Sequence, residues 1–278
     1  MKSTRFNGQN VLITGGSSGI GLEIARLFGQ LGANLFLVAR TPARLVQAKE
    51  TLTQALGPAG QVNTFEADVS DHRQIEAVIH QVGTEHGGLH TLINNAGMFL
   101  PGLVEDNSID NLKHIMQVNY FGAVYATKAA WPYLKAANRG HLGFVSSVAG
   151  YAGAIGYGAY APTKFALAGL AECLRMEAAD YGIGVTIVFP PDTDTPQLHY
   201  ENKHALPEAM ALKANAKVMT AAAVAQKFVD GIVNNRFEVL CNFESWYIRW
   251  VKATWPALYY KIVDNIVAKD RRRRGVLE

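Results

Sequence analysis

The sequence predicts an α/β fold with a doubly wound, Rossmann-type parallel sheet of about seven strands and helices on both faces. Apolar runs of strand length recur along the chain, and each is separated from the next by a segment long enough for a helix. The runs are residues 11–13, 35–38, 62–65, 91–93, 142–145 and 185–189, with a seventh near 237–240. Parallel neighbouring strands require such crossover connections, and these are right-handed.

Chain length and composition agree with one large buried core. The 278 residues are 49% apolar, which suffices for a sheet covered on both faces. The net charge is +3 and the clearest basic excess is at residues 271–274, so a nucleic-acid surface is not expected. Cys173 and Cys241 are the only cysteines and lie far apart, which argues against a disulfide scaffold and a zinc site of cysteine pairs. We expect no metal.

The domain organisation and location follow from what the chain lacks. Residues 1–10 are polar, without the basic-then-apolar pattern of a secretory signal, and no apolar run reaches the roughly 18 residues of a spanning helix. We therefore expect a cytoplasmic protein. In the absence of a linker, residues 1–242 are predicted to form one catalytic domain with a substrate lid at 197–218, followed by a separate segment at 243–278.

A glycine-rich turn follows the first predicted strand, and a helical pattern begins directly after it. Glycines let a pyrophosphate approach the helix N-terminus, where unpaired N–H groups and the helix dipole favour negative charge. The motif alone is also consistent with an ordinary loop, but the strand before it and the helix after it favour a dinucleotide site. The expected cofactor contacts are Gly15, Ser17, Ser18, Gly19, Ile20 and Gly21.

The second and third strands end in residues that bear on the choice of cofactor. Arg40 stands where an NAD-binding fold has a carboxylate for the ribose 2′-hydroxyl. A guanidinium binds a 2′-phosphate through several donors, so Arg40, with Ser17 and Arg44, favours NADPH, the alternative being a solvated loop cation. Asp68 and Val69 are expected at the adenine, although Asp68 is equally consistent with the N-cap of the helix beginning near residue 71.

The end of the fourth strand supplies another loop at the same edge of the sheet. Its sequence is Asn94-Asn95-Ala96-Gly97, and ligands bind at the carboxyl edge in open α/β folds. Asn95, Ala96 and Gly97 are expected to contact the cofactor, and an ordinary Asn/Gly turn is the alternative.

The fifth strand and the helix after it carry the candidate chemistry. The strand ends in Ser146-Ser147, and Tyr160 and Lys164 share a helix face because they are four residues apart. A tyrosine pKa near ~10 is too high for an efficient proton relay at neutral pH, and a nearby ammonium lowers it. Ser147 would hold a substrate carbonyl and Tyr160 would donate the proton. Tyr157 has no such partner, because position 161 is alanine.

Taken together, the glycine-rich turn, the Asn94–Gly97 loop, Ser147, Tyr160 and Lys164 resemble the short-chain dehydrogenase/reductase family over residues 8 to 240. The resemblance implies that Asn119 joins the proton relay through a water and that Tyr160 and Lys164 also contact the nicotinamide ribose. It further implies transfer of the 4-pro-S hydride and a homodimer or homotetramer.

One loop departs from the family pattern. Where the family usually has Pro-Gly followed by a threonine that binds the nicotinamide carboxamide, this chain has Pro190-Pro191-Asp192-Thr193-Asp194-Thr195. We expect a stiffer loop, with Pro190 beside the cofactor and Thr193 or Thr195 at the carboxamide. Asp192 and Asp194 are equally consistent with residues that form the local turn.

This loop, the glycine-rich turn and Val38-Ala39-Arg40 together resemble one subgroup, the 3-ketodihydrosphingosine reductases. The resemblance implies NADPH-dependent reduction of 3-ketosphinganine, a small lipid-like ketone, in sphingolipid synthesis. A β-ketoacyl or steroid ketone is the alternative substrate, because the catalytic tetrad is shared across the family. The complete tetrad argues against a non-catalytic, NADPH-sensing protein at a membrane surface.

The C-terminal segment combines aromatic and basic residues. Trp246, Trp250 and Trp255 fall within 243–268, and four arginines follow. This mixture is typical of an amphipathic helix at a membrane–water interface, so residues 243–274 are a candidate peripheral membrane contact. A pocket wall or oligomer interface is an equal alternative. Pro256 is predicted to separate two helices.

The remaining expectations concern the surroundings of the pocket. Residues 98–100 and the lid are expected to border it. His199 and His204 in the lid have no partners at metal-ligand spacing and are interpreted as lid or surface residues.

Overall fold

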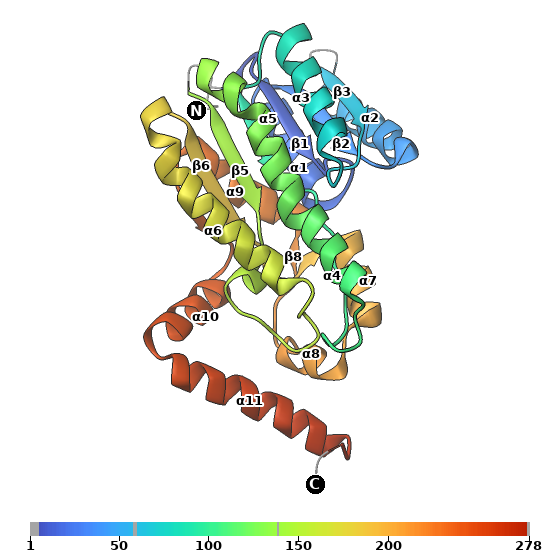
Figure 1. Cartoon of the computed structure of the whole chain (residues 1–278), viewed down its shortest axis with the longest axis vertical. Coiled ribbons are helices and arrows are strands. Elements are labelled where there is room, and N and C mark those ends of the chain that lie inside the picture. Colours follow the sequence, from blue (N-terminus) through green and yellow to red (C-terminus); the bar gives the residue numbers. More distant parts are fainter. Residues whose placement is uncertain (1–5, 58–59, 138, 277–278) are drawn as a thin grey trace.

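A seven-stranded parallel sheet forms the centre of the protein (Figure 1). The computed structural model describes residues 6–57, 60–137 and 139–276. Residues 1–5 of the predicted catalytic domain and residues 277–278 of the predicted C-terminal segment therefore lie outside the described residues. The strand order is β3-β2-β1-β4-β5-β6-β9. The strands are β1 (Asn10–Thr14), β2 (Asn34–Ala39), β3 (Val62–Glu66), β4 (Thr91–Asn94), β5 (His141–Val145), β6 (Gly184–Phe189) and β9 (Glu238–Leu240). The predicted fold class is confirmed, and each predicted run coincides with one of these strands.

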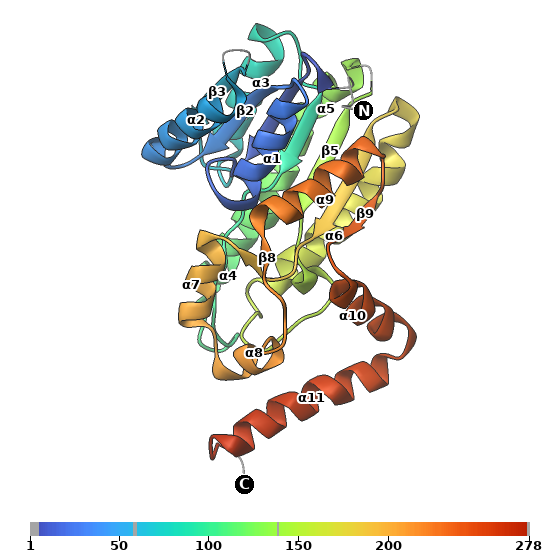
Figure 2. The same ribbon diagram turned by 180° about the vertical axis from the view of Figure 1, so that it is seen from behind.

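Helices cover both faces of the sheet, as Figures 1 and 2 show from opposite sides. One face packs against α3 (His72–Glu85), α5 (Gly122–Ala136) and α6 (Ala161–Glu177), and the other against α1 (Gly19–Gln30), α2 (Pro42–Leu56) and α9 (Ala221–Val233). Each face has its own buried apolar cluster. Strands buried on both faces read as continuous apolar runs rather than alternating ones, which explains why they were visible in the sequence.

The sheet changes direction of winding between β1 and β4. The chain passes outward from β1 to β2 and β3, then returns to place β4 on the other side of β1. Ile13 is accordingly paired with Leu37 on one side and with Ile93 on the other. The loops after β1 and β4 leave the sheet on either side of a crevice at its carboxyl edge, which is where ligands bind in this topology.

A helical insert lies beyond this edge, between two short strands. β7 (Thr193–Asp194) pairs with β8 (Met219–Thr220), and between them lie α7 (Pro196–His204) and α8 (Pro207–Leu212). The predicted lid at 197–218 is thus an excursion whose two ends are tied together. Four shorter elements lie within the catalytic part of the chain: α4 (Ile109–Met116), the π-helical turn η2 (Gln117–Phe121), and the 3-10 turns η3 (Val148–Gly150) and η4 (Ala179–Tyr181).

Two C-terminal helices extend below the sheet and cross under the insert (Figure 2). They are α10 (Phe243–Thr254) and α11 (Pro256–Arg273), and Pro256 separates them as predicted. No helix in the described ranges is long and apolar enough to cross a membrane. Ion pairs join the end of α11 to α8: Glu208 lies 2.7 Å from Arg274 and 3.1 Å from Arg271. Part of the basic run therefore holds α11 in place.

Candidate active site

A cavity of about 640 Å³ begins at the glycine-rich turn, passes Tyr160 and continues to α10 and α11. This volume is in the range of small-molecule sites in proteins. Most of the predicted cofactor residues lie in its wall: Gly15, Ser17, Ser18, Gly19, Ile20, Arg40, Arg44, Val69, Asn95, Ala96, Gly97, Tyr160, Lys164, Pro190, Thr193 and Thr195. Ser147 of the predicted tetrad also lines it, whereas Gly21, Asp68 and Asn119 lie behind or beside the wall.

The glycine-rich turn has the shape that a pyrophosphate requires. Gly15 has a φ of +65°, and a Cβ there would lie 2.9 Å from the Ala96 Cα. A Cβ on Gly21 would lie 2.4 Å from the Gly15 carbonyl oxygen, so only glycine lets the helix start so close to the turn. Ser18, the N-cap of α1, makes no capping hydrogen bond with its side chain, which leaves N–H groups of the first turn available to an anion. These residues fit a dinucleotide.

Arg40 and Arg44 lie at the same end of the cavity, and both are exposed. Arg40 Nη1 is 3.7 Å from Asp68 Oδ2, while Asp68 Oδ1 accepts hydrogen bonds from the Ser70 amide at 2.9 Å and hydroxyl at 2.7 Å. Asp71, not Asp68, is the N-cap of α3, so the capping alternative for Asp68 is wrong. Asp68 is instead turned toward Arg40 and its own loop.

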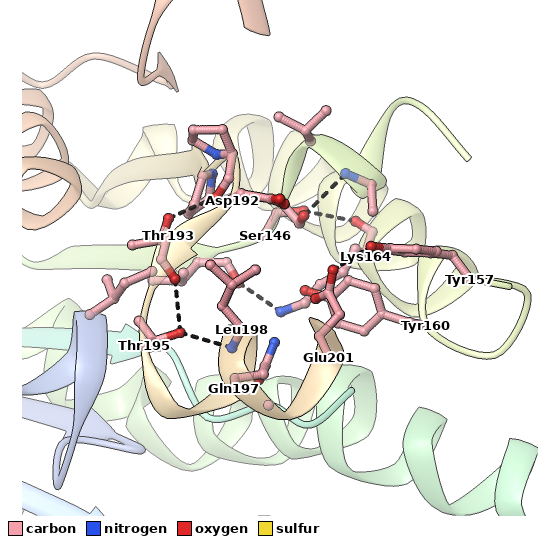
Figure 3. A pocket seen from close by; sticks show the side chains of 18 of the residues that line it. Ser146, Tyr157, Tyr160, Lys164, Asp192, Thr193, Thr195, Gln197, Leu198 and Glu201 are labelled. Atoms are coloured by element: carbon pink, nitrogen blue, oxygen red, sulfur yellow. Dashed lines mark hydrogen bonds between the residues drawn. The ribbon is translucent and has the colours of Figure 1, made fainter. Parts of the chain in front are cut away.

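Three of the four predicted catalytic side chains, Ser147, Tyr160 and Lys164, meet midway along the cavity, and Figure 3 shows Tyr160 and Lys164 there. Tyr160 lies at the N-terminus of α6, is 5% exposed, and makes hydrogen bonds with Ser147 and Gln197. Lys164 follows one turn later, with its Nζ 5.6 Å from the centre of the Tyr160 ring. The same Nζ donates to the Val145 carbonyl at 3.0 Å. Strand β5 and helix α6 thus place three residues from two parts of the sequence side by side.

The environment of Tyr160 keeps its phenol protonated. Burial and the charge of Glu201 raise the Tyr160 pKa above its usual value, while the hydrogen bonds from Ser147 and Gln197 act in the opposite direction. Burial also lowers the pKa of the neighbouring Lys164 ammonium, to about 8. The phenol is therefore protonated at neutral pH, and a cationic group brought close to it would make proton donation easier.

Asn119 lies in the π-helical turn η2 and is 1% exposed. Its Oδ1 accepts from the Met98 amide at 2.8 Å, and its Nδ2 donates to the Met98 carbonyl at 2.9 Å and to Thr163 Oγ1 at 3.0 Å. The side chain therefore ties the loop after β4 to the first turn of α6, where Tyr160 sits.

The Pro-Pro loop is ordered by its own side chains. Thr193 Oγ1 donates to the Pro191 carbonyl at 2.7 Å, and Thr195 Oγ1 donates to the Thr193 carbonyl at 3.1 Å. Thr195 is also the N-cap of α7, accepting from the Leu198 amide at 3.2 Å (Figure 3). Both threonines line the cavity as expected, with their hydroxyls engaged in the loop.

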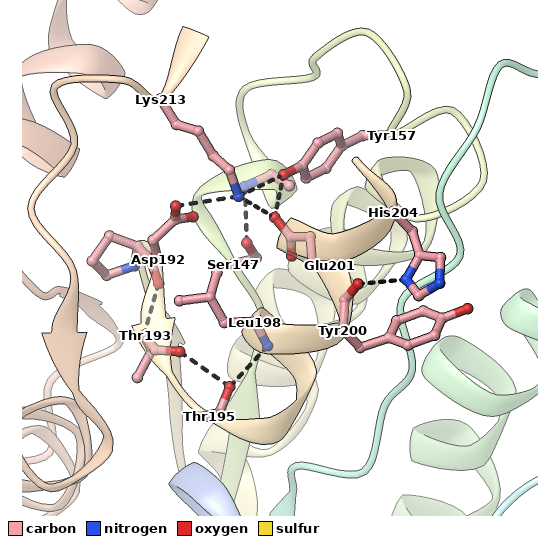
Figure 4. A network of polar contacts seen from close by, with 12 residues as sticks. Ser147, Tyr157, Asp192, Thr193, Thr195, Leu198, Tyr200, Glu201, His204 and Lys213 are labelled. Atoms are coloured by element: carbon pink, nitrogen blue, oxygen red, sulfur yellow. Dashed lines mark hydrogen bonds and ion pairs between the residues drawn. The ribbon is translucent and has the colours of Figure 1, made fainter. Parts of the chain in front are cut away.

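A polar network at the lid was not foreseen (Figure 4). The Tyr157 hydroxyl donates to Glu201 Oε1, and Lys213 Nζ lies 2.6 Å from Glu201 Oε1 and 3.3 Å from Asp192 Oδ2. All four residues line the cavity. The available sequence signal was helical spacing: Gln197 and Glu201 are four residues apart in α7, so both can face the cavity.

Three expectations about neighbouring residues need correction or detail. Residues 98–100 do not line the cavity; Phe99 packs behind it, its ring centre 5.2 Å from that of Tyr160. His199 and His204 are exposed lid residues, bonded to Asp194 and to the Tyr200 carbonyl. The described residues contain no group of three or more acidic, histidine or cysteine side chains placed to hold a metal.

The far end of the cavity is apolar and belongs to the C-terminal helices. Helix α10 contributes Ile248 and Val251, and Trp255 follows at the junction with α11. Helix α11 contributes Leu258, Tyr259, Ile262, Val263 and Ile266. The aromatic and aliphatic residues of this segment therefore form a pocket wall, one of the two alternatives left open by the sequence.

Comparison with known proteins agrees with this geometry. The family model described as short chain dehydrogenase matches residues 9–206. The chain is 42% identical to a 3-dehydrosphinganine reductase of Danio rerio, over 85% of this chain and 72% of the relative. It is 40% identical to a 3-ketodihydrosphingosine reductase of Bos taurus over the same shares of the two chains.

Solved structures show the same fold. Levodione reductase superposes with a TM-score of 0.79 at 26% identity, covering 87% of this chain and 99% of that chain. A short-chain dehydrogenase/reductase from Burkholderia phymatum in complex with NAD gives a TM-score of 0.81 at 24% identity, covering 91% and 95%. By these matches, and with Ser147, Tyr160 and Lys164 together in one cavity, the chain belongs to the short-chain dehydrogenase/reductase family and is a nicotinamide-dependent oxidoreductase.

Proposed function

We propose that this enzyme reduces 3-ketosphinganine to sphinganine with NADPH. The observation that carries the proposal is the single cavity that joins a cofactor crevice, a buried tyrosine and an apolar passage between α10 and α11. A long-chain ketone needs all three: a hydride source, a proton donor at the carbonyl, and apolar walls for the chain. The relatives of Danio rerio and Bos taurus, both reductases of this ketone by name, support the same substrate.

The chemistry assigned to the chain is a proton transfer to a positioned carbonyl. When bound, the cofactor supplies a hydride to the carbonyl carbon. Ser147 holds the carbonyl oxygen, and Tyr160 gives its proton to that oxygen as the alcohol forms. Lys164, whose Nζ donates to the Val145 carbonyl, would bind the nicotinamide ribose beside Tyr160. Asn119 keeps the loop after β4 against α6.

NADPH is proposed over NADH because of the charge at the adenosine end of the cavity. Arg40 and Arg44 both line this end. Guanidinium groups bind a 2′-phosphate through charge-assisted hydrogen bonds, which a 2′-hydroxyl cannot match. Asp68 Oδ2 lies 3.7 Å from Arg40 Nη1, and this contact keeps the guanidinium group beside the crevice.

We also propose that α10 contacts a membrane surface in the cytoplasm. Its pocket face carries Ile248 and Val251, whereas Phe243, Trp246 and Trp250 lie outside the cavity wall and are 73%, 46% and 38% exposed. The Trp246 and Trp250 rings are stacked with centres 5.9 Å apart, so they present one aromatic surface. Aromatic rings of this kind favour the membrane–water interface. The two alternatives for this segment are thus compatible, on opposite faces of one helix.

Two further proposals concern assembly and closure. Helices α5 and α6 are the proposed dimer or tetramer interface, and Met176 on α6 and Phe121 just before α5 are exposed apolar side chains there. The excursion 197–218 is the proposed lid, because α7 and α8 both contribute residues to the cavity wall.

The substrate and the proton donor are tested together. Purified enzyme should oxidise NADPH rapidly with 3-ketosphinganine, and slowly with a short β-ketoacyl thioester or a steroid ketone.

Replacing Tyr160 with phenylalanine should lower kcat at least ~100-fold and leave NADPH binding intact, because the general acid is lost. Tyr181→Phe, at an exposed tyrosine outside the cavity, is the matched control. Normal turnover by Tyr160→Phe would exclude this mechanism.

Cofactor choice is tested at Arg40. Arg40→Ala should raise the KM for NADPH roughly 10- to 100-fold, the scale of a lost charge-assisted contact, and change the KM for NADH little. Steady-state kinetics with each cofactor measure this directly. Arg73→Ala, at an exposed position in the first turn of α3, is the control. Equal effects on both cofactors would contradict a 2′-phosphate contact.

The membrane proposal is tested by vesicle flotation. The double variant Trp246→Ala and Trp250→Ala should bind vesicles of phosphatidylcholine and phosphatidylserine at least ~10-fold more weakly, because two aromatic side chains leave the interface. Its activity on a detergent-dispersed substrate should be retained, since neither ring lines the cavity. Unchanged vesicle binding would locate the contact elsewhere.

A further inference from the structure

The lid places a carboxylate, Glu201, near the catalytic residues in the cavity. The reduction itself does not require this carboxylate. Glu201, on α7, is 7% exposed, lines the cavity, and is close enough to Tyr160 for its charge to raise the pKa of the phenol. Figure 3 shows Glu201 and Tyr160 side by side, Glu201 on α7 and Tyr160 at the start of α6. Burying a carboxylate is costly even when a cation such as Lys213, 2.6 Å from Glu201 Oε1, compensates part of its charge, so its position beside Tyr160 calls for a reason.

The polar contacts of Glu201 leave one oxygen available. In the described part of the chain, the hydrogen bonds that this carboxylate accepts, from Tyr157 and Lys213, both go to Oε1, and Oε2 accepts none. Lys213 is shared with Asp192 at 3.3 Å, so two carboxylates face one ammonium in this network. Lys164, the other nearby cation, donates to the Val145 carbonyl. This end of the cavity therefore has an acceptor for one more cationic group.

We propose that Glu201 recognises the ammonium group of an α-amino ketone and makes that group the specificity determinant of the enzyme. The inference rests on the proposed function and deepens it: the substrate class is a ketone with a protonated amine on the adjacent carbon and a long apolar chain. The ammonium binds Glu201, the carbonyl lies at Ser147 and Tyr160, and the chain follows the apolar passage of α10 and α11. A neutral β-ketoacyl or steroid ketone lacks the group that Glu201 binds.

The same contact links recognition to chemistry. The charge of Glu201 disfavours the tyrosinate that remains after Tyr160 gives up its proton. A substrate ammonium bound to Glu201 offsets that charge, so proton donation is easier with the amino ketone in place than with a neutral ketone.

The test compares two substrates and two glutamates. The substrates are 3-ketosphinganine and the same ketone with hydrogen in place of the amino group. Wild type should favour the amino ketone. Glu201→Gln should lower kcat/KM for the amino ketone roughly 10- to 100-fold, the scale of a lost charge-assisted hydrogen bond. For the neutral ketone kcat/KM should stay the same or rise, because the charge that disfavours the tyrosinate is gone. Glu172→Gln, at an exposed position on α6, should leave both values unchanged. Cofactor affinity and Tm verify folding.

A second variant keeps the inference testable if Glu201→Gln does not fold. Lys213→Gln removes the internal cation that partly neutralises Glu201, so the substrate ammonium meets a stronger negative charge and the KM for the amino ketone should fall relative to that for the neutral ketone. An unchanged or higher KM for the amino ketone would contradict the inference.

The outcomes separate the inference from the function it rests on. If wild type reduces 3-ketosphinganine and Glu201→Gln lowers both substrates equally, or keeps the preference, Glu201 is structural and only this inference fails. If wild type reduces the neutral ketone and not 3-ketosphinganine, the proposed function fails with it. If Glu201→Gln loses the preference for the amino ketone and Glu172→Gln keeps it, the result supports both the inference and the proposed function.

Discussion

Hydrogen bonds between Thr14 and the loop after β4 hold together the two loops on which the site is built. Thr14 Oγ1 accepts from the Asn95 and Ala96 amides, each at 3.1 Å, and Asn95 Nδ2 donates to the Thr14 carbonyl at 2.9 Å. These bonds span the point where the winding of the sheet reverses. They set the width of the crevice into which the glycine-rich turn, Arg40 and the catalytic residues all project.

Charge and burial divide this crevice into regions with different tasks. Arginines stand at the end beside the glycine-rich turn, a buried phenol and a buried lysine at the centre, and apolar side chains of α10 and α11 at the far end. The excursion between β7 and β8 adds Glu201 and Lys213 beside the phenol, so the central region contains both the proposed proton donor and the proposed site for a charged substrate group. Helix α11 is held against α8 through Glu208, which joins part of the apolar wall to the excursion between β7 and β8.

The parts of the site that the sequence predicted are those governed by local rules. The strands were visible because their two faces are buried, and Tyr160 with Lys164 because helical spacing places them together. The position of Asp68 was not predictable, since Asp71 three residues later competes for the same N-cap. Glu201 and Lys213 escaped notice because they meet only when the chain between β7 and β8 folds back over Tyr157, a contact between distant residues.

The exposed aromatic face of α10 illustrates the same limit. Aromatic and basic residues were evident in the sequence, but their division between a pocket face and an outer face depends on where α10 and α11 leave the sheet. For the arginines at residues 271–274, the sequence predicted lipid contact and gave no sign of ion pairs. Glu208 and Asp270 engage three of them, Arg271, Arg273 and Arg274, in ion pairs.

We propose that one cavity brings the cofactor's hydride to the carbonyl of an amino ketone. The decisive measurement is to incubate the enzyme with 3-ketosphinganine and NADPH that carries deuterium at the 4-pro-S position, and to analyse the product by mass spectrometry. We expect sphinganine with a single deuterium on the carbon that bore the ketone. Unlabelled sphinganine would show that this hydride is not the one transferred, and absence of sphinganine would exclude the proposed reaction.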